Sequence, residues 1–275
     1  MENYVFFVSI AIIMLTTKIL GDMTNKVNMP QVVGAVLAGI IIGPSCLGLI
    51  EQTDFISKTA EIGVVLLMFT AGLDTDMEQL RKNSVACFVI AAIGVIVPLI
   101  GGTACYYFYF EEENTDYDSI LKAIFIGVVL TATSVSITVE ALREMGKLDG
   151  KVGNAILGAA VIDDIMGIIV LTVVISLKDE SVSIVSILLK ILLYVALMIM
   201  IAYICKSFKG IIDANKGKRR ITTYVVAACF IVAFASEEYF GIADITGAYL
   251  LGLFLSQHEI KHEIATEHPY HEWYK

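Results

Sequence analysis

Two adjacent aspartates, Asp163 and Asp164, stand in the middle of a stretch, about 152–177, that is otherwise apolar or small. At about 1.5 Å of rise per residue, a helix over this stretch places Asp164 about 18 Å from its start and about 20 Å from its end. The carboxylates would therefore lie near the midplane of a bilayer. Because ionisable side chains are costly at that depth, the two aspartates predict an ion or proton site. The alternative is that they are structural acids with buried partners.

The two carboxylates point in different directions, since neighbours on a helix are about 100° apart. Asp163 shares its face with Ala159 and Gly167, small residues that let another helix approach closely. Asp164 shares its face with Ala160 and bulkier apolar residues. We expect one acid to face a neighbouring helix and the other a cavity.

A run of hydroxyl-bearing and β-branched residues, TATSVSIT at 131–138, lies in the preceding apolar span. Such residues have weak helix preference, and their hydroxyls compete for backbone hydrogen bonds. Taken alone, the run is compatible with an intact helix whose hydroxyls bond their own carbonyls. Next to two mid-membrane acids it favours an unwound turn that presents carbonyls, hydroxyls and two half-helix ends to an ion.

Composition assigns these stretches to an all-α, polytopic membrane protein, because 57% of the 275 residues are hydrophobic and the mean hydropathy is +0.79. About nine apolar runs are interpreted as transmembrane helices, roughly at 4–20, 31–50, 57–73, 85–110, 119–140, 152–177, 182–205, 221–236 and 241–256. The first run has an acidic start and no cleavage pattern, which indicates a retained helix. In the second, Ala35, Gly39 and Gly43 form a small-residue stripe that suits a close helix crossing.

Lysines and arginines are distributed unevenly between the polar loops, although the formal net charge is −9. With the amino terminus outside, fifteen of the 19 basic residues fall on one side, and only Lys58, Lys122, Lys178 and Lys190 on the other. Because basic loops accumulate in the cytoplasm, we predict a multi-pass cell-membrane protein with a cytoplasmic polar tail at 257–275. Topology alone explains the basic loop 206–220, so lipid headgroups are expected partners and nucleic acid is not.

Five segments resemble the monovalent cation:proton antiporters. They are PQVVGAVLAGIIIGP (30–44), LLMFTAGLD (66–74), TATSVSIT (131–138), AAVIDD (159–164) and GAYLLGL (247–253). The resemblance is closest to the second branch of that superfamily, the bacterial and archaeal sodium/proton antiporters related to potassium-efflux antiporters. It runs from about residue 30 to 256.

The resemblance implies a core of crossed, broken helices and a separate dimerisation domain, which move against each other in an elevator-like cycle within a homodimer. Carried over by position, Asp164 is the carboxylate that binds a monovalent cation or a proton. Asp163 is its neighbour, which in the family is salt-bridged to a lysine on a later helix. Thr131, Thr133 and Ser134 mark the unwound crossing that supplies oxygen ligands. No cofactor is implied beyond the transported protons and sodium, potassium or lithium.

The family continues for about four more helices, including the lysine-bearing one, so residues 1–256 correspond to an incomplete antiporter domain. Lys190 is the only lysine well inside a predicted span, and it lies near the outer face. We expect a secondary transporter that exchanges a monovalent cation, sodium first, for protons. The alternatives are a potassium-efflux-type transporter, a channel with the same fold, and a non-transporting fragment or assembly partner of a longer antiporter.

An enzyme is not expected. An intramembrane aspartyl protease would need its two aspartates on separate helices so that they share a water. Here they are adjacent, and no Gly-x-Gly-Asp stretch occurs. The five cysteines have no C-x-x-C spacing, so neither a metal site nor a disulfide framework is indicated.

Overall fold

The computed structural model describes residues 5–110, 117–148, 150–177, 184–207 and 219–256, and within these ranges every regular element is a helix. The helices are α1 (Val5–Lys26), α2 (Gln31–Ile42), α3 (Asp54–Asp74), α4 (Met77–Lys82), α5 (Ser84–Phe110), α6 (Tyr117–Val129), α7 (Val135–Glu144), α8 (Lys151–Ser176), α9 (Ile184–Ser207), α11 (Arg219–Phe240) and α12 (Asp244–Leu255). The predicted all-α class is confirmed. The predicted tail at 257–275 and most of the basic loop lie outside the described residues.

Six of these helices, α1, α3, α5, α8, α9 and α11, are long and apolar enough to cross a membrane. Helices α2 and α12 are apolar but have 12 residues each, about 18 Å of rise against a hydrocarbon core of about 30 Å. The predicted full-length spans at 31–50 and 241–256 are therefore wrong in extent. Helix α2 stops at Ile42 because Gly43 is extended (φ −74°, ψ 179°) and Pro44 follows it.

The predicted span at 119–140 is broken, as the hydroxyl run indicated. Helix α6 ends at Val129 and α7 begins at Val135, with a turn and non-helical backbone between them. The buried Thr131 hydroxyl donates to the Val128 carbonyl (2.7 Å) and so binds one of the carbonyls left over at the end of α6. The expected unwound turn is confirmed for the first half of the run, whereas residues 135–138 are helical.

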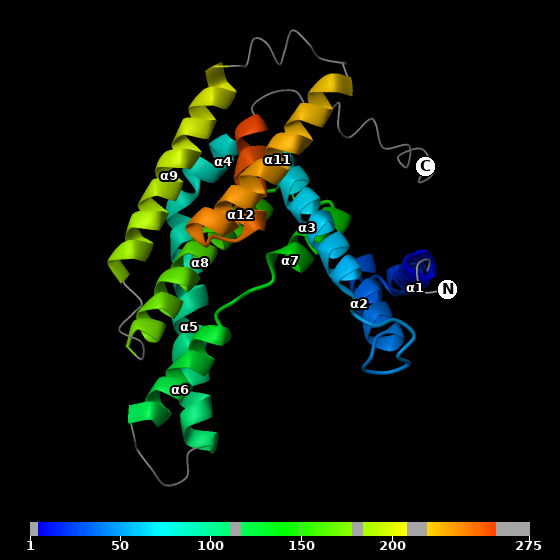
Figure 1. Cartoon of the computed structure of the whole chain (residues 1–275), viewed down its shortest axis with the longest axis horizontal. Coiled ribbons are helices and arrows are strands. Elements are labelled where there is room, and N and C mark those ends of the chain that lie inside the picture. The colour runs from blue at the N-terminus through cyan, green and yellow to red at the C-terminus, as the bar shows by residue number, and fades with distance from the viewer. Residues whose placement is uncertain (1–4, 111–116, 149, 178–183, 208–218, 257–275) are drawn as a thin grey trace.

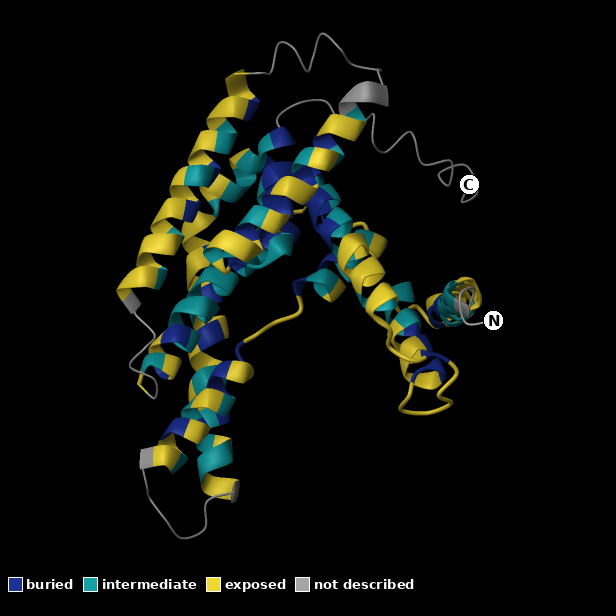
Figure 2. Ribbon diagram, in the orientation of Figure 1, coloured by how far each residue is buried: buried dark blue, intermediate teal, exposed yellow. Residues whose placement is uncertain are grey.

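Two groups of helices diverge from a common junction (Figure 1). Helices α5, α6 and α8 pack together in one group, and α1, α2 and α3 follow one another in the other. Helix α7 lies between the groups, and α11 and α12 cross where they meet. Buried residues concentrate at this junction, while the far ends of the helices are largely exposed (Figure 2). The junction is therefore the core that fixes the position of α12 relative to α8.

Helices α3 and α12 cross at two glycines. A Cβ on Gly72 would lie 2.2 Å from the carbonyl oxygen of Tyr249, and one on Gly252 would lie 2.2 Å from the carbonyl oxygen of Phe69. Both distances are far below van der Waals contact, so only glycine permits this approach. The crossing also buries Tyr249 and Phe69 almost completely, at 0% and 1% exposure.

The close contact of α2 with α1 involves a different face from the predicted one. Gly34, Ala38 and Ile42 are buried, and a Cβ on Gly34 would lie 2.4 Å from the backbone of Leu20. Gly39, from the predicted stripe, faces open space, because a Cβ added to it would meet no described atom within 4 Å. The prediction was wrong by one residue, which on a helix is a rotation of about 100°.

Helix α7 is attached to α2 and α3 by polar side chains. Arg143 donates a hydrogen bond to the Thr70 hydroxyl (3.0 Å) and lies 3.7 Å from Asp74 and 3.5 Å from Glu140. The neighbouring Glu144 accepts a hydrogen bond from the backbone N–H of Gln31, the first residue of α2. These contacts anchor the second half of the broken helix.

Candidate ion-binding site

Helix α8 carries both aspartates through the junction without a break, and each is half-buried. Small residues bring α8 against its neighbours. A Cβ on Gly158 would meet Leu80 Cδ1 at 2.4 Å and Cys87 Sγ at 2.8 Å, so α8 packs closely against α4 and the start of α5. The positions of Asp163 and Asp164 are thereby fixed by packing one to two turns earlier in the helix.

Asp163 faces α5 and the broken helix. It lines a cavity of about 140 Å³ with Thr133, Thr138, Gly94 and further apolar residues of α5 and α8. A Cβ on Gly94 would lie 3.9 Å from Asp163 Oδ1, which places the glycine backbone next to the carboxylate. We expected one aspartate to face a helix and the other a cavity; Asp163 faces both, because the cavity lies between it and α5.

Helix α5 also contains Pro98, four residues after Gly94. Proline has no N–H, so the Gly94 carbonyl cannot accept the hydrogen bond that a helix normally supplies from that position. The glycine beside Asp163 therefore offers a carbonyl oxygen without its usual donor. The Asp163 carboxylate and the Thr133 hydroxyl add oxygen atoms of the kind that hard cations bind to a cavity whose lining is otherwise mostly aliphatic.

Asp164 faces a different neighbour, α12. The hydroxyl of Thr246 donates a hydrogen bond to Asp164 Oδ2, across 82 residues of sequence. Thr246 is 2% exposed and lies in the first turn of α12, which the α3 crossing holds in place. The sequence analysis did not identify Thr246; its only signal was a hydroxyl directly before the GAYLLGL segment.

The predicted oxygen ligands are divided between different environments. Thr133 lines the Asp163 cavity and lies 3.4 Å from the Thr131 carbonyl, to which its hydroxyl donates. The Thr131 hydroxyl is used by the end of α6, and Ser134 is exposed at the start of α7 without a capping bond. The structure thus brings Thr133 to Asp163, and it does not bring the three hydroxyls together around Asp164.

Lys190 does not substitute for the lysine that the family resemblance implies. It is exposed on α9, and in the part of the chain that the structure describes no ion pair joins a lysine to either aspartate. Both carboxylates would therefore need a proton or a bound cation to be neutral in a membrane.

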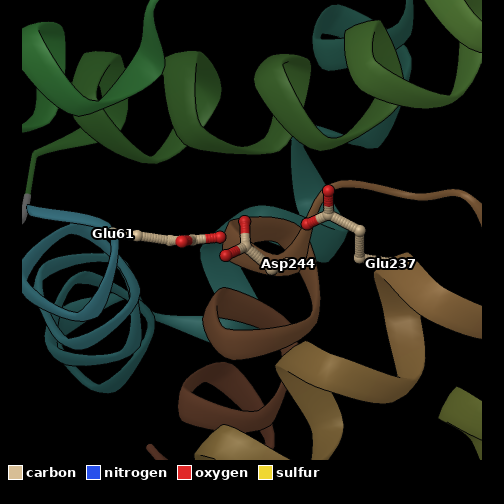
Figure 3. Close-up of side chains that lie close together, drawn as sticks. All are labelled: Glu61, Glu237 and Asp244. Carbon is tan, nitrogen blue, oxygen red and sulfur yellow. The ribbon is translucent and has the colours of Figure 1, made fainter. Parts of the chain in front are cut away.

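A second group of acids comes from α3, the end of α11 and the start of α12. One carboxylate oxygen each from Glu61, Glu237 and Asp244 falls within 4.8 Å of the others, and Figure 3 shows Glu61 and Asp244 pointing toward one another. The three line an open pocket of about 490 Å³ together with Lys58. Glu61 and Glu237 are exposed, so the group raises the local cation concentration as surface acids do.

Comparisons with known proteins identify a family for the chain. The family model described as sodium/hydrogen exchanger, transmembrane, matches residues 8–271. The chain is 38% identical to the probable Na⁺/H⁺ antiporter GerT of Bacillus cereus, covering 94% of this chain and 68% of that protein. It is 36% identical to the Na⁺/H⁺-K⁺ antiporter GerN of the same species, and 30% identical to a Na⁺/H⁺ antiporter of Enterococcus hirae, covering 66% of each. The chain thus spans about two thirds of the length of these relatives.

Proposed function

The chain belongs to the family of transmembrane sodium/hydrogen exchangers, and from this premise we propose that it exchanges sodium for protons, with Asp164 and Asp163 as the ion-binding carboxylates. The observation that carries the assignment of these residues is their position on α8. One carboxylate lines a cavity with the broken α6–α7 segment, and the other accepts a hydrogen bond from α12. Two adjacent acids at the middle of a membrane-length helix have no simpler explanation in packing.

The exchange follows from charge neutrality. A carboxylate removed from bulk water is neutralised either by a proton or by a monovalent cation, and the two compete for the same charge. A site that is reached alternately from each side of the membrane then couples the two fluxes. If both aspartates change protonation, two protons exchange for one cation and net charge moves; if only Asp164 does, the exchange is electroneutral. We favour the first scheme because the aspartate pair resembles the electrogenic members of the family.

Potassium is the second candidate cation, because one relative, GerN, is named a Na⁺/H⁺-K⁺ antiporter. The proposal further includes the elevator-like movement, the homodimer and the cell-membrane topology with the amino terminus outside. The topology is supported by the distribution of basic residues, fifteen of 19 of which fall on the cytoplasmic side. The dimer and the movement are supported by the family resemblance.

Cation-induced proton efflux from everted vesicles tests the proposal. The vesicles come from an antiporter-deficient bacterium that expresses the chain, its Asp164→Asn variant or an Asp22→Asn variant. Asp22 is an exposed acid paired with Lys18 at 2.9 Å, so its amide controls for the loss of a carboxylate elsewhere. We expect efflux with sodium from the wild type and Asp22→Asn, and none from Asp164→Asn.

Two results would contradict the proposal. Efflux that persists in Asp164→Asn would exclude this residue as the essential carboxylate. Absence of efflux with sodium, potassium and lithium, in membranes shown to contain the protein, would favour a non-transporting partner of a longer antiporter. A zero transport current over a range of voltages in an active preparation would leave the exchange intact and exclude only the electrogenic scheme.

A further inference from the structure

The hydroxyl of Thr246 is directed away from its own helix. Threonine in a helix usually donates to the carbonyl three or four residues earlier, as Thr172 of α8 does to Ile168 (2.7 Å). Thr246 instead donates to Asp164 Oδ2, although it is buried in the first turn of α12. A hydroxyl that donates to a carboxylate on another helix contributes directly to the environment of that carboxylate.

A second buried hydroxyl lies in the same region. Tyr194 of α9 is 1% exposed, and its hydroxyl has no hydrogen-bond partner among the described residues. It lies near Ser236, whose hydroxyl donates to the Val232 carbonyl at 2.8 Å and lies against Gly247, the residue after Thr246. A hydroxyl buried without a hydrogen bond is unfavourable, so Tyr194 has an unused oxygen for a group that binds beside it.

We propose that Thr246 and Tyr194 supply oxygen ligands to the cation at Asp164, so that α12 and α9 form the side of the site opposite the broken helix. The inference rests on the proposed function. In this arrangement the cation is the missing partner of the Tyr194 hydroxyl. The additional ligands of Asp164 come from α12 and α9, and not from the hydroxyl run at 131–138.

The chemistry of a hydroxyl suits every state of the exchange. A hydroxyl has one donor and two acceptor positions, and its hydrogen rotates freely. With Asp164 charged, Thr246 donates to it across the contact seen between the two side chains. With a cation bound, the hydrogen turns away and a lone pair coordinates the ion. With a proton bound, Asp164 donates to Thr246. Because both added ligands are neutral, one monovalent cation balances the Asp164 charge.

Equilibrium binding of ²²Na⁺ to the purified 275-residue chain in detergent, at alkaline pH, tests the inference without requiring transport. The variants are Thr246→Val, Thr246→Ser, Tyr194→Phe and Asp164→Asn. Thr172→Val is the matched control, because it removes a similarly buried threonine hydroxyl that bonds only its own helix. Gel filtration and circular dichroism verify that each variant is folded.

We expect Thr246→Val to raise the half-saturating sodium concentration about tenfold, as loss of one hydrogen bond to a charged group does. Tyr194→Phe should raise it several-fold, while Thr246→Ser and the Thr172→Val control should bind as the wild type does. Should Thr246→Val bind sodium as well as the control, the inference is overturned and the proposed function stands. If Thr246→Val does not fold, unchanged binding by Tyr194→Phe overturns the tyrosine ligand, and weakened binding by Tyr194→Phe beside wild-type binding by Thr246→Ser supports the site. Absence of saturable binding to the wild type would overturn the proposed function itself.

Discussion

Replacement of Gly72 by alanine should separate α3 from α12 and destabilise the junction. The new Cβ would lie 2.2 Å from the Tyr249 carbonyl oxygen and 2.9 Å from the Leu253 nitrogen, both of them backbone atoms that cannot rotate away. Ordinary contact begins near 3.4 Å, so the helices must separate by about 1 Å. Overpacking of this kind costs about 1–3 kcal/mol.

Gly63→Ala on the same helix is the control. Nothing lies within 4 Å of its added Cβ, so only the better helix propensity of alanine acts, about 1 kcal/mol in favour of folding. Because the propensity gain acts at both positions, we expect the two variants to differ by the overpacking cost, about 1–3 kcal/mol, with Gly72→Ala the less stable. Thermal unfolding in detergent, followed by circular dichroism, measures the difference. Equal stability of Gly72→Ala and Gly63→Ala would refute the close crossing, and with it the packing that presents Thr246 to Asp164.

Three further outcomes follow from the polar contacts and the topology. Arg143→Gln should lower the midpoint temperature of unfolding. This loss should be smaller in about 1 M choline chloride, because the salt screens the ion pairs of Arg143 without supplying a transported cation. A loss that does not depend on salt would contradict an electrostatic role of Arg143. Asp76 caps α4 by accepting from the N–H groups of Gln79 (3.2 Å) and Glu78 (2.8 Å), which hold the pKa of its carboxyl below the ordinary 3.8. Because the folded-state pKa is lowered, the carboxylate stabilises the folded protein above pH 3.8, and this stabilisation is lost as the pH falls through the folded-state pKa. Asp76→Ala should therefore lower the free energy of unfolding by about 0.5–1 kcal/mol near pH 6 and by less near pH 3, which unfolding measured at both pH values checks. In a variant that retains only Cys46, an exposed cysteine between α2 and α3, a membrane-impermeant maleimide should label intact cells; labelling only in everted vesicles would invert the proposed topology.

The features that the sequence predicted correctly are local ones. The break between α6 and α7 follows from residue types, because a dense run of hydroxyls and β-branched side chains weakens a helix wherever it lies. The adjacent aspartates were recognisable because charge is rare at the middle of an apolar helix. Their different surroundings also followed from the geometry of consecutive helical residues.

The features that were missed depend on contacts between distant segments. In α2, residues 34 and 38 are as small as 35 and 39, and only the approach of α1 decides which face is buried. The pairing of Thr246 with Asp164 depends on the α3–α12 crossing, for which no local pattern exists. Hydropathy also overestimated the length of α2, because it counts apolar residues past Pro44 without registering that the helical hydrogen bonds have ended.

Pro98 has a consequence for water. A carbonyl deprived of its helical donor is costly in hydrocarbon unless another donor reaches it, and at the middle of α5 the smallest available donor is a water molecule. Gly94 lines the cavity together with Asp163 and Thr133, so we expect that cavity to be hydrated and not filled by lipid tails. The proline then marks where the hydrocarbon phase gives way to an aqueous vestibule beside Asp163.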